Sequence, residues 1–306
     1  MKNTKIHPAW IAAGITFITL VASAGYRSAP SVLIVPLEEA FGWTRDQISL
    51  AVSVNILLYG LTAPFAAALM ERFTVRKVVM SALFAVGLGS FFTLFMTRPW
   101  HLVLLWGVVV GVGTGSMALV FAATVANRWF VEKRGLVIGG LTAAAATGQL
   151  IFLPVLSSLA LNFGWQSVSI TIGIAALIVV PLIWWGLNES PQSINAKPFG
   201  AKADWTAPTP IPGSAAKNAI VALKRGSRRK DFWLLFGTFF VCGLSTNGLI
   251  GTHFIPAAHD HGMHEVVAAS LLAMIGVFDV VGTLTSGYLT DKFDPRKLLF
   301  FYYGFR

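Results

Sequence analysis

Two charged side chains stand deep inside long apolar stretches of this sequence. Arg27 lies in GYRSAP and Asp279 lies in GVFDVVGT. An ionisable group at that depth costs about 2.5–3.5 kcal/mol to insert into a bilayer, so each is expected to face a cavity or a partner. Arg27 offers a planar fork of N–H donors that matches a carboxylate. Desolvation favours the neutral form of a carboxyl group, so Asp279 is suited to carrying a proton.

Each of the two residues also has a plainer interpretation. Arg27 can snorkel to the membrane surface or pair permanently with an acid. Asp279 can belong to a fixed salt bridge or to a cation site. If the two lie close together, an anion that engages Arg27 releases Asp279 to bind a proton. That antagonism predicts coupling between the anion and the proton.

A long internal repeat organises the chain. Residues 67–78 read AALMERFTVRKV and residues 287–298 read GYLTDKFDPRKL, so an acid, a base, a Phe and an Arg-Lys pair recur 220 positions apart. In an apolar chain such a repeat predicts two homologous helical bundles, an arrangement found in many secondary transporters. The same offset relates Arg27 to Asn247 and Asp279 to Tyr59. We therefore expect these four residues to converge on one cavity between the bundles.

Polar residues in the same spans complete the predicted site. Asn247 and His253 lie in CGLSTNGLIGTHF, whose glycines permit a bent span. We expect His253 to relay protons or to gate the exterior mouth. Hydrogen bonding to a neighbouring helix is the alternative for these polar side chains. The predicted substrate-binding residues are Arg27, Asn247, Tyr26, Asn55 and Tyr59.

The composition places the chain in a membrane. It is 55% hydrophobic and 12% charged, with a mean hydropathy of +0.70. Apolar stretches near the ~20 residues needed to cross a bilayer recur along it. The predicted spans are 9–36, 47–70, 78–97, 102–126, 135–161, 166–187, 233–256 and 266–290, with a ninth beginning near 298. Because there is only one cysteine, Cys242, an intrachain disulfide is excluded.

The distribution of Lys and Arg predicts the orientation. These residues gather at the N-terminus, in the loops after the second, fourth and eighth spans, and in the segment 188–231, whereas only Arg45 and Arg98 fall on the opposite side. The N-terminus is therefore expected to be cytoplasmic. The same bias explains the net charge of +10, so the basic run at 223–230 indicates anionic lipid and not nucleic acid.

The chain divides into three parts. We expect an N-terminal six-helix bundle at 1–187, a cytoplasmic linker at 188–231 and the start of a C-terminal bundle at 232–306. The linker is rich in Pro, Gly and Ala, which predicts flexibility, but 214–230 is expected to form a basic helix on the membrane surface. A second bundle that matches the first needs further spans, so the sequence is interpreted as C-terminally truncated.

The charged loops of the repeat predict a cytoplasmic gate. An acid there can sit against the amino end of a neighbouring helix and pair with Arg or Lys, holding the ends of the bundles together. The alternative is that these loops serve membrane topology alone. The predicted gate residues are Glu71, Arg72, Arg76, Asp291, Lys292 and Arg296.

The repeated loop resembles the G-x-x-x-D-R-x-G-x-R-K signature of the major facilitator superfamily. FGWTRDQIS, NRWFVEKRGL and THFIPAAHDHG are similar to its bacterial monocarboxylate-transporter-like branch. The resemblance implies an all-α membrane protein with the major facilitator fold, with about eight or nine of twelve transmembrane helices present. It also implies a multi-pass monomer in the bacterial inner membrane. One departure is Thr283, where the related carriers often have an Arg one turn beyond the Asp.

The resulting expectation is a secondary transporter that moves a small, monocarboxylate-like anion with a proton by alternating access. Anion exchange without a proton and efflux of drugs or metabolites are the alternatives within transport. A membrane enzyme or a receptor is the alternative outside it, although no clustered carboxylates or histidines at the cytoplasmic face point to catalysis. The run HDHGMH at 259–264 has no recognised metal-binding spacing, and no cofactor is expected.

Overall fold

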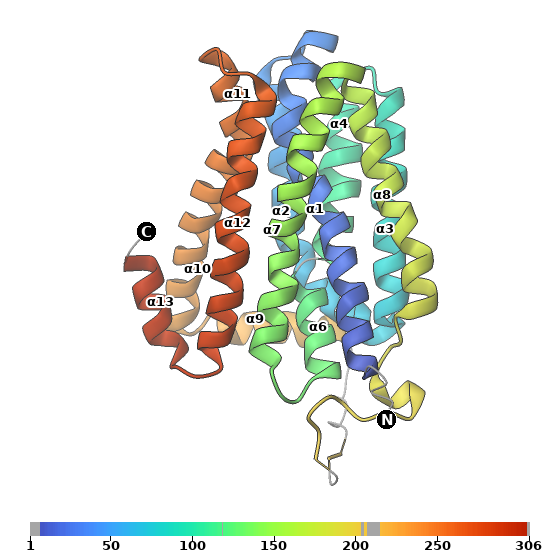
Figure 1. Ribbon diagram of the computed structural model, residues 1–306, viewed down its shortest axis with the longest axis vertical. Helices are drawn as coiled ribbons and strands as arrows, with labels where there is room; N and C mark the ends of the chain where they lie inside the picture. Colours follow the sequence, from blue (N-terminus) through green and yellow to red (C-terminus); the bar gives the residue numbers. More distant parts are fainter. Residues whose placement is uncertain (1–6, 118, 203–204, 207–214, 305–306) are drawn as a thin grey trace, which may run out of the picture.

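The computed structural model describes residues 7–117, 119–202, 205–206 and 215–304; the side chains of Ala215, Ala216 and Asn247 also lie outside the description. Long helices run side by side along one axis (Figure 1). Within the described residues, eight helical segments are long and apolar enough to cross a membrane. The predicted all-α membrane fold is confirmed, and the predicted spans agree with these segments to within a few residues at most ends.

The first half of the chain supplies six of these segments. Its helices are α1 (Pro8–Phe41), α2 (Arg45–Phe73), α3 (Val75–Phe92), α4 (Pro99–Leu102), α5 (Gly111–Ser116), α6 (Leu119–Trp129), α7 (Arg134–Phe163) and α8 (Trp165–Gly186). The 3-10 turn η1 (Thr93–Phe95) extends α3, and the π-helical segment η2 (Val103–Val110) joins α4 to α5. The first helix continues five residues past the predicted end at Pro36 and stops at Gly42, whose φ of 66° suits glycine.

The linker contains η3 (Pro191–Ile194) and α9 (Ala215–Gly226). The second half follows it, with the elements α10 (Lys230–Cys242), η4 (Gly243–Ile250), α11 (Gly251–Asp260), α12 (Glu265–Thr290) and α13 (Pro295–Gly304). The segment η4 is π-helical, so the glycine-rich part of the seventh span departs from regular α-helix. Helix α9 lies across one end of the bundle, the same end as the N-terminus (Figure 1). We call this end the α9 end.

Glycines four residues apart allow the fourth span to pack closely against α2. A Cβ added at Gly111 would lie 3.0 Å from the Asn55 Cα, and one at Gly115 would lie 2.7 Å from the Tyr59 carbonyl oxygen. Small residues that bring two backbones together are the usual basis of helix association in lipid. This glycine run therefore serves close helix packing.

The two halves meet along α7 and α12. A Cβ added at Gly139 would lie 2.8 Å from the Thr283 carbonyl oxygen, and one at Gly287 would lie 2.7 Å from the Gly135 carbonyl oxygen. Gly135 and Gly139 are four residues apart on α7, as are Thr283 and Gly287 on α12. Two stripes of small residues therefore face each other and set how closely the halves approach.

The linker is anchored over its first part, contrary to the predicted flexibility. Phe199 packs against Trp10 and Phe130, with ring centroids 5.6 Å and 5.9 Å away. Its backbone N–H donates to the Trp129 carbonyl at 2.8 Å, and its own carbonyl accepts from Val131 N–H at 2.8 Å. Phe199, an aromatic residue in a polar segment, thus packs among other aromatic side chains at the α9 end. The predicted basic helix corresponds to α9.

Candidate functional site

A cavity of about 80 Å³ lies within the first half of the chain. Helices α1, α2, α5, α6 and α7 contribute its walls. One water molecule needs about 10–15 Å³ of such space, so the cavity has room for a small solute. The lining residues are Leu20, Ser23, Ala24, Arg27, Tyr59, Thr114, Met117, Leu119, Ala122, Leu141, Thr142 and Ala145.

Arg27 and Tyr59 meet at the wall of this cavity. The guanidinium carbon of Arg27 lies over the Tyr59 ring, 5.2 Å from its centroid. A cation over the face of an aromatic ring is attracted by the negative charge of that face. Arg27 is also exposed, so a solute can reach it. The structure thus brings together two of the predicted site residues, one from α1 and one from α2.

Three other polar side chains of the lining donate their hydroxyl protons to backbone carbonyls and not into the cavity. The hydroxyl of Ser23 donates to the Leu20 carbonyl at 2.9 Å, and that of Thr142 donates to the Ile138 carbonyl at 2.8 Å. Thr114 does the same within its own span. Among the lining residues Arg27 alone carries a formal charge. The cavity therefore has a positive electrostatic character and favours an anion.

Asp279 lies at the depth of this cavity on α12. Along the contact of the two halves, Gly276 of α12 meets Ala146 of α7, and Thr283 meets Gly139. Asp279 therefore falls opposite the stretch of α7 that includes Thr142, a lining residue of the cavity. The side chain of Asp279 is exposed and does not line the cavity itself.

The remaining predicted site residues occupy different surroundings. Tyr26 is buried, 2% exposed, and its hydroxyl has no hydrogen-bond partner within the described part of the chain. Asn55 donates its Nδ2 to the Trp106 carbonyl at 2.7 Å, within the π-helical segment η2, so it ties α2 to the fourth span. His253 is half-buried on α11. The backbone of Asn247 lies in η4, and its side chain is outside the described residues.

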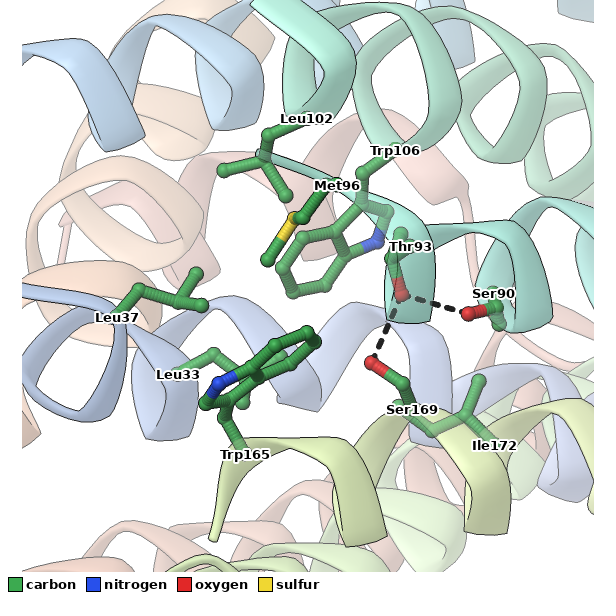
Figure 2. Close-up of a pocket in the computed structure, with 10 residues that line it drawn as sticks. All are labelled: Leu33, Leu37, Ser90, Thr93, Met96, Leu102, Trp106, Trp165, Ser169 and Ile172. Atoms are coloured by element: carbon green, nitrogen blue, oxygen red, sulfur yellow. Dashed lines mark hydrogen bonds between the residues drawn. The ribbon is translucent and has the colours of Figure 1, made fainter. Parts of the chain in front are cut away.

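A second void in the first half is too small to be a binding site. Figure 2 shows Trp106 and Trp165 facing it, with Thr93 between Ser90 and Ser169. The Thr93 hydroxyl donates to the Ser90 carbonyl at 2.6 Å and lies 3.0 Å from the Ser169 hydroxyl. The void measures about 10 Å³, roughly the space for one water molecule. These residues belong to the packed interior.

At the α9 end, Asp291 joins the two halves. Its Oδ1 accepts from Gly135 N–H and its Oδ2 from Leu136 N–H, both at 3.2 Å. Both donors lie in the first turn of α7, where N–H groups have no partner inside the helix and the helix dipole favours a negative charge. Among the ion pairs of the described residues none involves Asp291, so backbone amides replace the predicted Arg or Lys partner.

Two other predicted gate residues, Arg76 and Arg72, make contacts that stay within the first half. Arg76 donates to the Trp184 carbonyl at 2.9 Å and lies over the Trp184 ring, so it fastens α3 to α8 within the first half. Arg72 lies over Phe73 of its own helix, 5.1 Å from the ring centroid. Among all the predicted gate residues, the contacts found in the described part of the chain place only Asp291 at the junction of the two halves.

Three further predicted gate residues stay on the surface at this end. Lys292 lies over Tyr288, 4.4 Å from the ring centroid, and the backbone N–H of Arg296 donates to Asp294 at 2.9 Å. Glu71 is exposed at the last turn of α2. These positions are typical of a solvated loop.

Sequence reasoning missed Glu189, which organises the α9 end of the first half. Its Oε2 accepts from Val75 N–H at 2.8 Å, at the start of α3, while its Oε1 pairs with Arg128 at the end of α6. One carboxylate after the sixth span thus fixes the ends of two other spans. An acid placed just inside a segment rich in Lys and Arg was the signal available for finding it.

No group of three or more potential metal ligands occurs in the described ranges of the chain. On either side of the turn between α11 and α12, His259 Nε2 lies 3.2 Å from Glu265 Oε1.

The helices and the two contacting halves define a polytopic helical membrane protein of the two-bundle class. Solved structures share this fold. The proton:xylose symporter XylE matches with a TM-score of 0.66 and 14% identity, over 93% of this chain and 70% of that protein. At that identity the likeness shows the fold alone.

The chain belongs to the major facilitator superfamily, because the sequence profile of that superfamily matches residues 15–305. It is 27% identical to the uncharacterized MFS-type transporter YcxA of Bacillus subtilis, over 95% of this chain and 67% of that protein. It is 26% identical to mouse monocarboxylate transporter 11, over 92% and 59%, and 24% identical to human monocarboxylate transporter 2, over 97% and 63%. The chain thus spans roughly three-fifths to two-thirds of these relatives. It is a multi-pass membrane protein of this superfamily.

Proposed function

We propose that the full-length protein carries a small monocarboxylate together with a proton across the bacterial cytoplasmic membrane. The observation that carries this proposal is the guanidinium of Arg27 at the wall of a small cavity, with its carbon 5.2 Å from the Tyr59 ring centroid. A guanidinium can bind a carboxylate through two parallel hydrogen bonds. Relatives named monocarboxylate transporters support the substrate class.

Asp279 is the residue proposed to carry the proton. It is a carboxyl group on a membrane-spanning helix, at the depth of the Arg27 cavity and on the other half of the molecule. A carboxyl group in a membrane span is by default a candidate for moving protons or ions. Binding of an anion next to Arg27 offsets the positive charge there, which assists proton uptake at Asp279. Electroneutral entry of one anion with one proton follows from this arrangement.

The proposed cycle is a rocking of two bundles, residues 1–187 and the part from 232 onward, with 188–231 as the linker. Opening at the α9 end requires separation of Asp291 from the first turn of α7. The proposed orientation puts that end in the cytoplasm, because Lys and Arg concentrate there. A monomer suffices for this cycle, since the cavity is formed by one chain.

Uptake by the full-length protein in sealed proteoliposomes tests the proposal. We expect saturable uptake of a labelled small monocarboxylate. Arg27→Ala should reduce kcat/KM roughly 10- to 100-fold, since charge-assisted hydrogen bonds contribute about 1.5–3 kcal/mol. Arg27→Lys should recover part of the loss because it keeps the charge but not the fork. Arg98→Gln, an exposed arginine remote from the cavity, is the matched control. Normal transport by Arg27→Ala contradicts the proposal.

The proton requires a separate measurement. Uptake by the wild-type protein should acidify the vesicle lumen in proportion to the acid transported. Asp279→Asn should abolish that acidification while leaving counterflow of labelled against unlabelled acid. Counterflow without acidification in the wild type instead identifies an anion exchanger.

A further inference from the structure

Arg45, at the first residue of α2, holds two carboxylates that belong to different halves of the molecule. Its Nε and Nη2 donate to Glu38 Oε1 and Oε2 at 3.0 and 3.2 Å. Its Nη1 and Nη2 donate to Asp260 Oδ2 and Oδ1 at 2.7 and 3.2 Å. Glu38 lies on α1 of the first half, and Asp260 is the last residue of α11 in the second half. We call Glu38, Arg45 and Asp260 the exterior latch.

The latch lies at the end of the bundle opposite α9 (Figure 1). The hydrogen bonds from Arg45 to Asp260 cross between the halves, over 215 positions of sequence. The hydrogen bonds from Arg45 to Glu38 stay within the first half. The neighbouring pair of His259 with Glu265 stays within the second half. Any motion that parts α11 from α1 and α2 at this end must therefore break the Arg45–Asp260 bonds and can leave the Arg45–Glu38 bonds intact.

We infer that Arg45 and Asp260 close the exterior end between the two halves, and that Glu38 is a positioning residue that keeps Arg45 paired while that end is open. When Asp260 moves away, Arg45 keeps Glu38 as a bidentate partner. Glu38 thus lowers the free energy needed to open the exterior end, whereas Asp260 raises it. This inference rests on the rocking motion of the proposed function, but it concerns the end of the molecule far from Asp291.

The geometry suits a contact that opens and closes. The side chains of Arg45, Glu38 and Asp260 are 37%, 24% and 45% exposed. Water reaches all three, so breaking the bonds to Asp260 leaves no buried unpaired charge, the costly outcome for interior ion pairs. The shared guanidinium uses its planar fork in two directions, which a lysine cannot do.

A cavity beside the latch provides a readout that needs no substrate. It measures about 450 Å³ and is lined by α1, α7, α11 and α12, including Pro36, Ser157, Ile255 and Glu265. Ser157 is 1% exposed, and its hydroxyl has no hydrogen-bond partner in the part of the chain that is described. A cysteine at this position should react with a bulky maleimide faster whenever the halves part at this end.

The test uses full-length protein in lipid nanodiscs, carrying Ser157→Cys and Cys242→Ser, with the rate of maleimide labelling as the measurement. Asp260→Asn and Arg45→Gln should each raise the rate roughly two- to fivefold, a size that an exposed ion pair supports. Glu38→Gln should lower it, although it is the same acid-to-amide change on the same arginine. Asp231→Asn, which removes an exposed pair with Arg229 at the α9 end, is the matched control and should leave the rate unchanged.

A double variant that exchanges the two charges controls for single variants that fold poorly. Arg45→Asp combined with Asp260→Arg should return the labelling rate toward that of the parent protein. Unchanged rates in Asp260→Asn, or equal shifts in the same direction for Asp260→Asn and Glu38→Gln, overturn the inference. Failure to transport any acid overturns the proposed function but leaves this labelling result in place.

Discussion

The guanidinium of Arg27 lies over the ring of Tyr59 across the α1–α2 interface, with 5.2 Å between the guanidinium carbon and the ring centroid. We expect this contact to help orient the cation. Removal of the ring leaves the charge in place but takes this contact away. The pair therefore separates the role of orientation from the role of charge.

Replacement of Tyr59 tests that orientation. Tyr59→Leu should raise the KM for the transported acid roughly 2- to 30-fold, because a cation–π contact contributes about 0.5–2 kcal/mol. Tyr59→Phe keeps the aromatic face and should stay close to the wild-type KM. The measurement is initial uptake rate against acid concentration in proteoliposomes. Equal effects of the two substitutions show that the phenol hydroxyl, and not the ring, matters.

The glycine stripe between α7 and α12 predicts a stability difference between two glycines of one helix. Gly287→Ala places a Cβ 2.7 Å from the Gly135 carbonyl and should destabilise the protein by about 1–3 kcal/mol, as overpacking does. Gly282→Ala meets no atom within 4 Å and should be neutral or slightly stabilising, since alanine favours helix. Thermal unfolding in detergent compares the two. The same melting temperature for both argues against a tight α7–α12 contact.

Asp291 should protect two specific amides. Asp291→Asn removes the negative charge at the start of α7, which contributes about 0.3–1 kcal/mol. Hydrogen–deuterium exchange of the peptide that contains Gly135 and Leu136 should therefore quicken. The side chain of Asp294, three residues further along, accepts from Arg296 N–H, so Asp294→Asn should leave that peptide unchanged. Unaltered exchange in Asp291→Asn shows that the contact does not hold the halves together.

Glu189 and Arg128 should be energetically coupled. Their side chains are 30% and 26% exposed, and Glu189 also accepts from Val75 N–H. Glu189→Gln should destabilise the protein by about 1–2 kcal/mol, since it weakens a charge-assisted network at the start of α3. A double-mutant cycle with Arg128→Gln should give a coupling energy of about 0.5 kcal/mol or more. Additive effects mean that the pair contributes little beyond its separate parts.

The sequence by itself determined the membrane spans, their order and the family. Hydrophobic segments long enough to cross a bilayer reveal themselves locally, because every residue in them meets the same apolar solvent. Glycines at regular spacing, as in the fourth span, are likewise a local signal of close helix packing.

Only the tertiary structure decided which partner each polar residue takes. Asn55 lies in a span whose sequence allows it to face a substrate, yet it bonds to the Trp106 carbonyl in a π-helical segment. Arg76 belongs to the repeated motif, yet it fastens α3 to α8. Arg45 and Asp260 lie in two separate family-like stretches with no local sign of a pairing, yet they meet across 215 positions. A sequence records the side chain and its local period, but a hydrogen bond depends on distance and angle, which long-range helix packing sets.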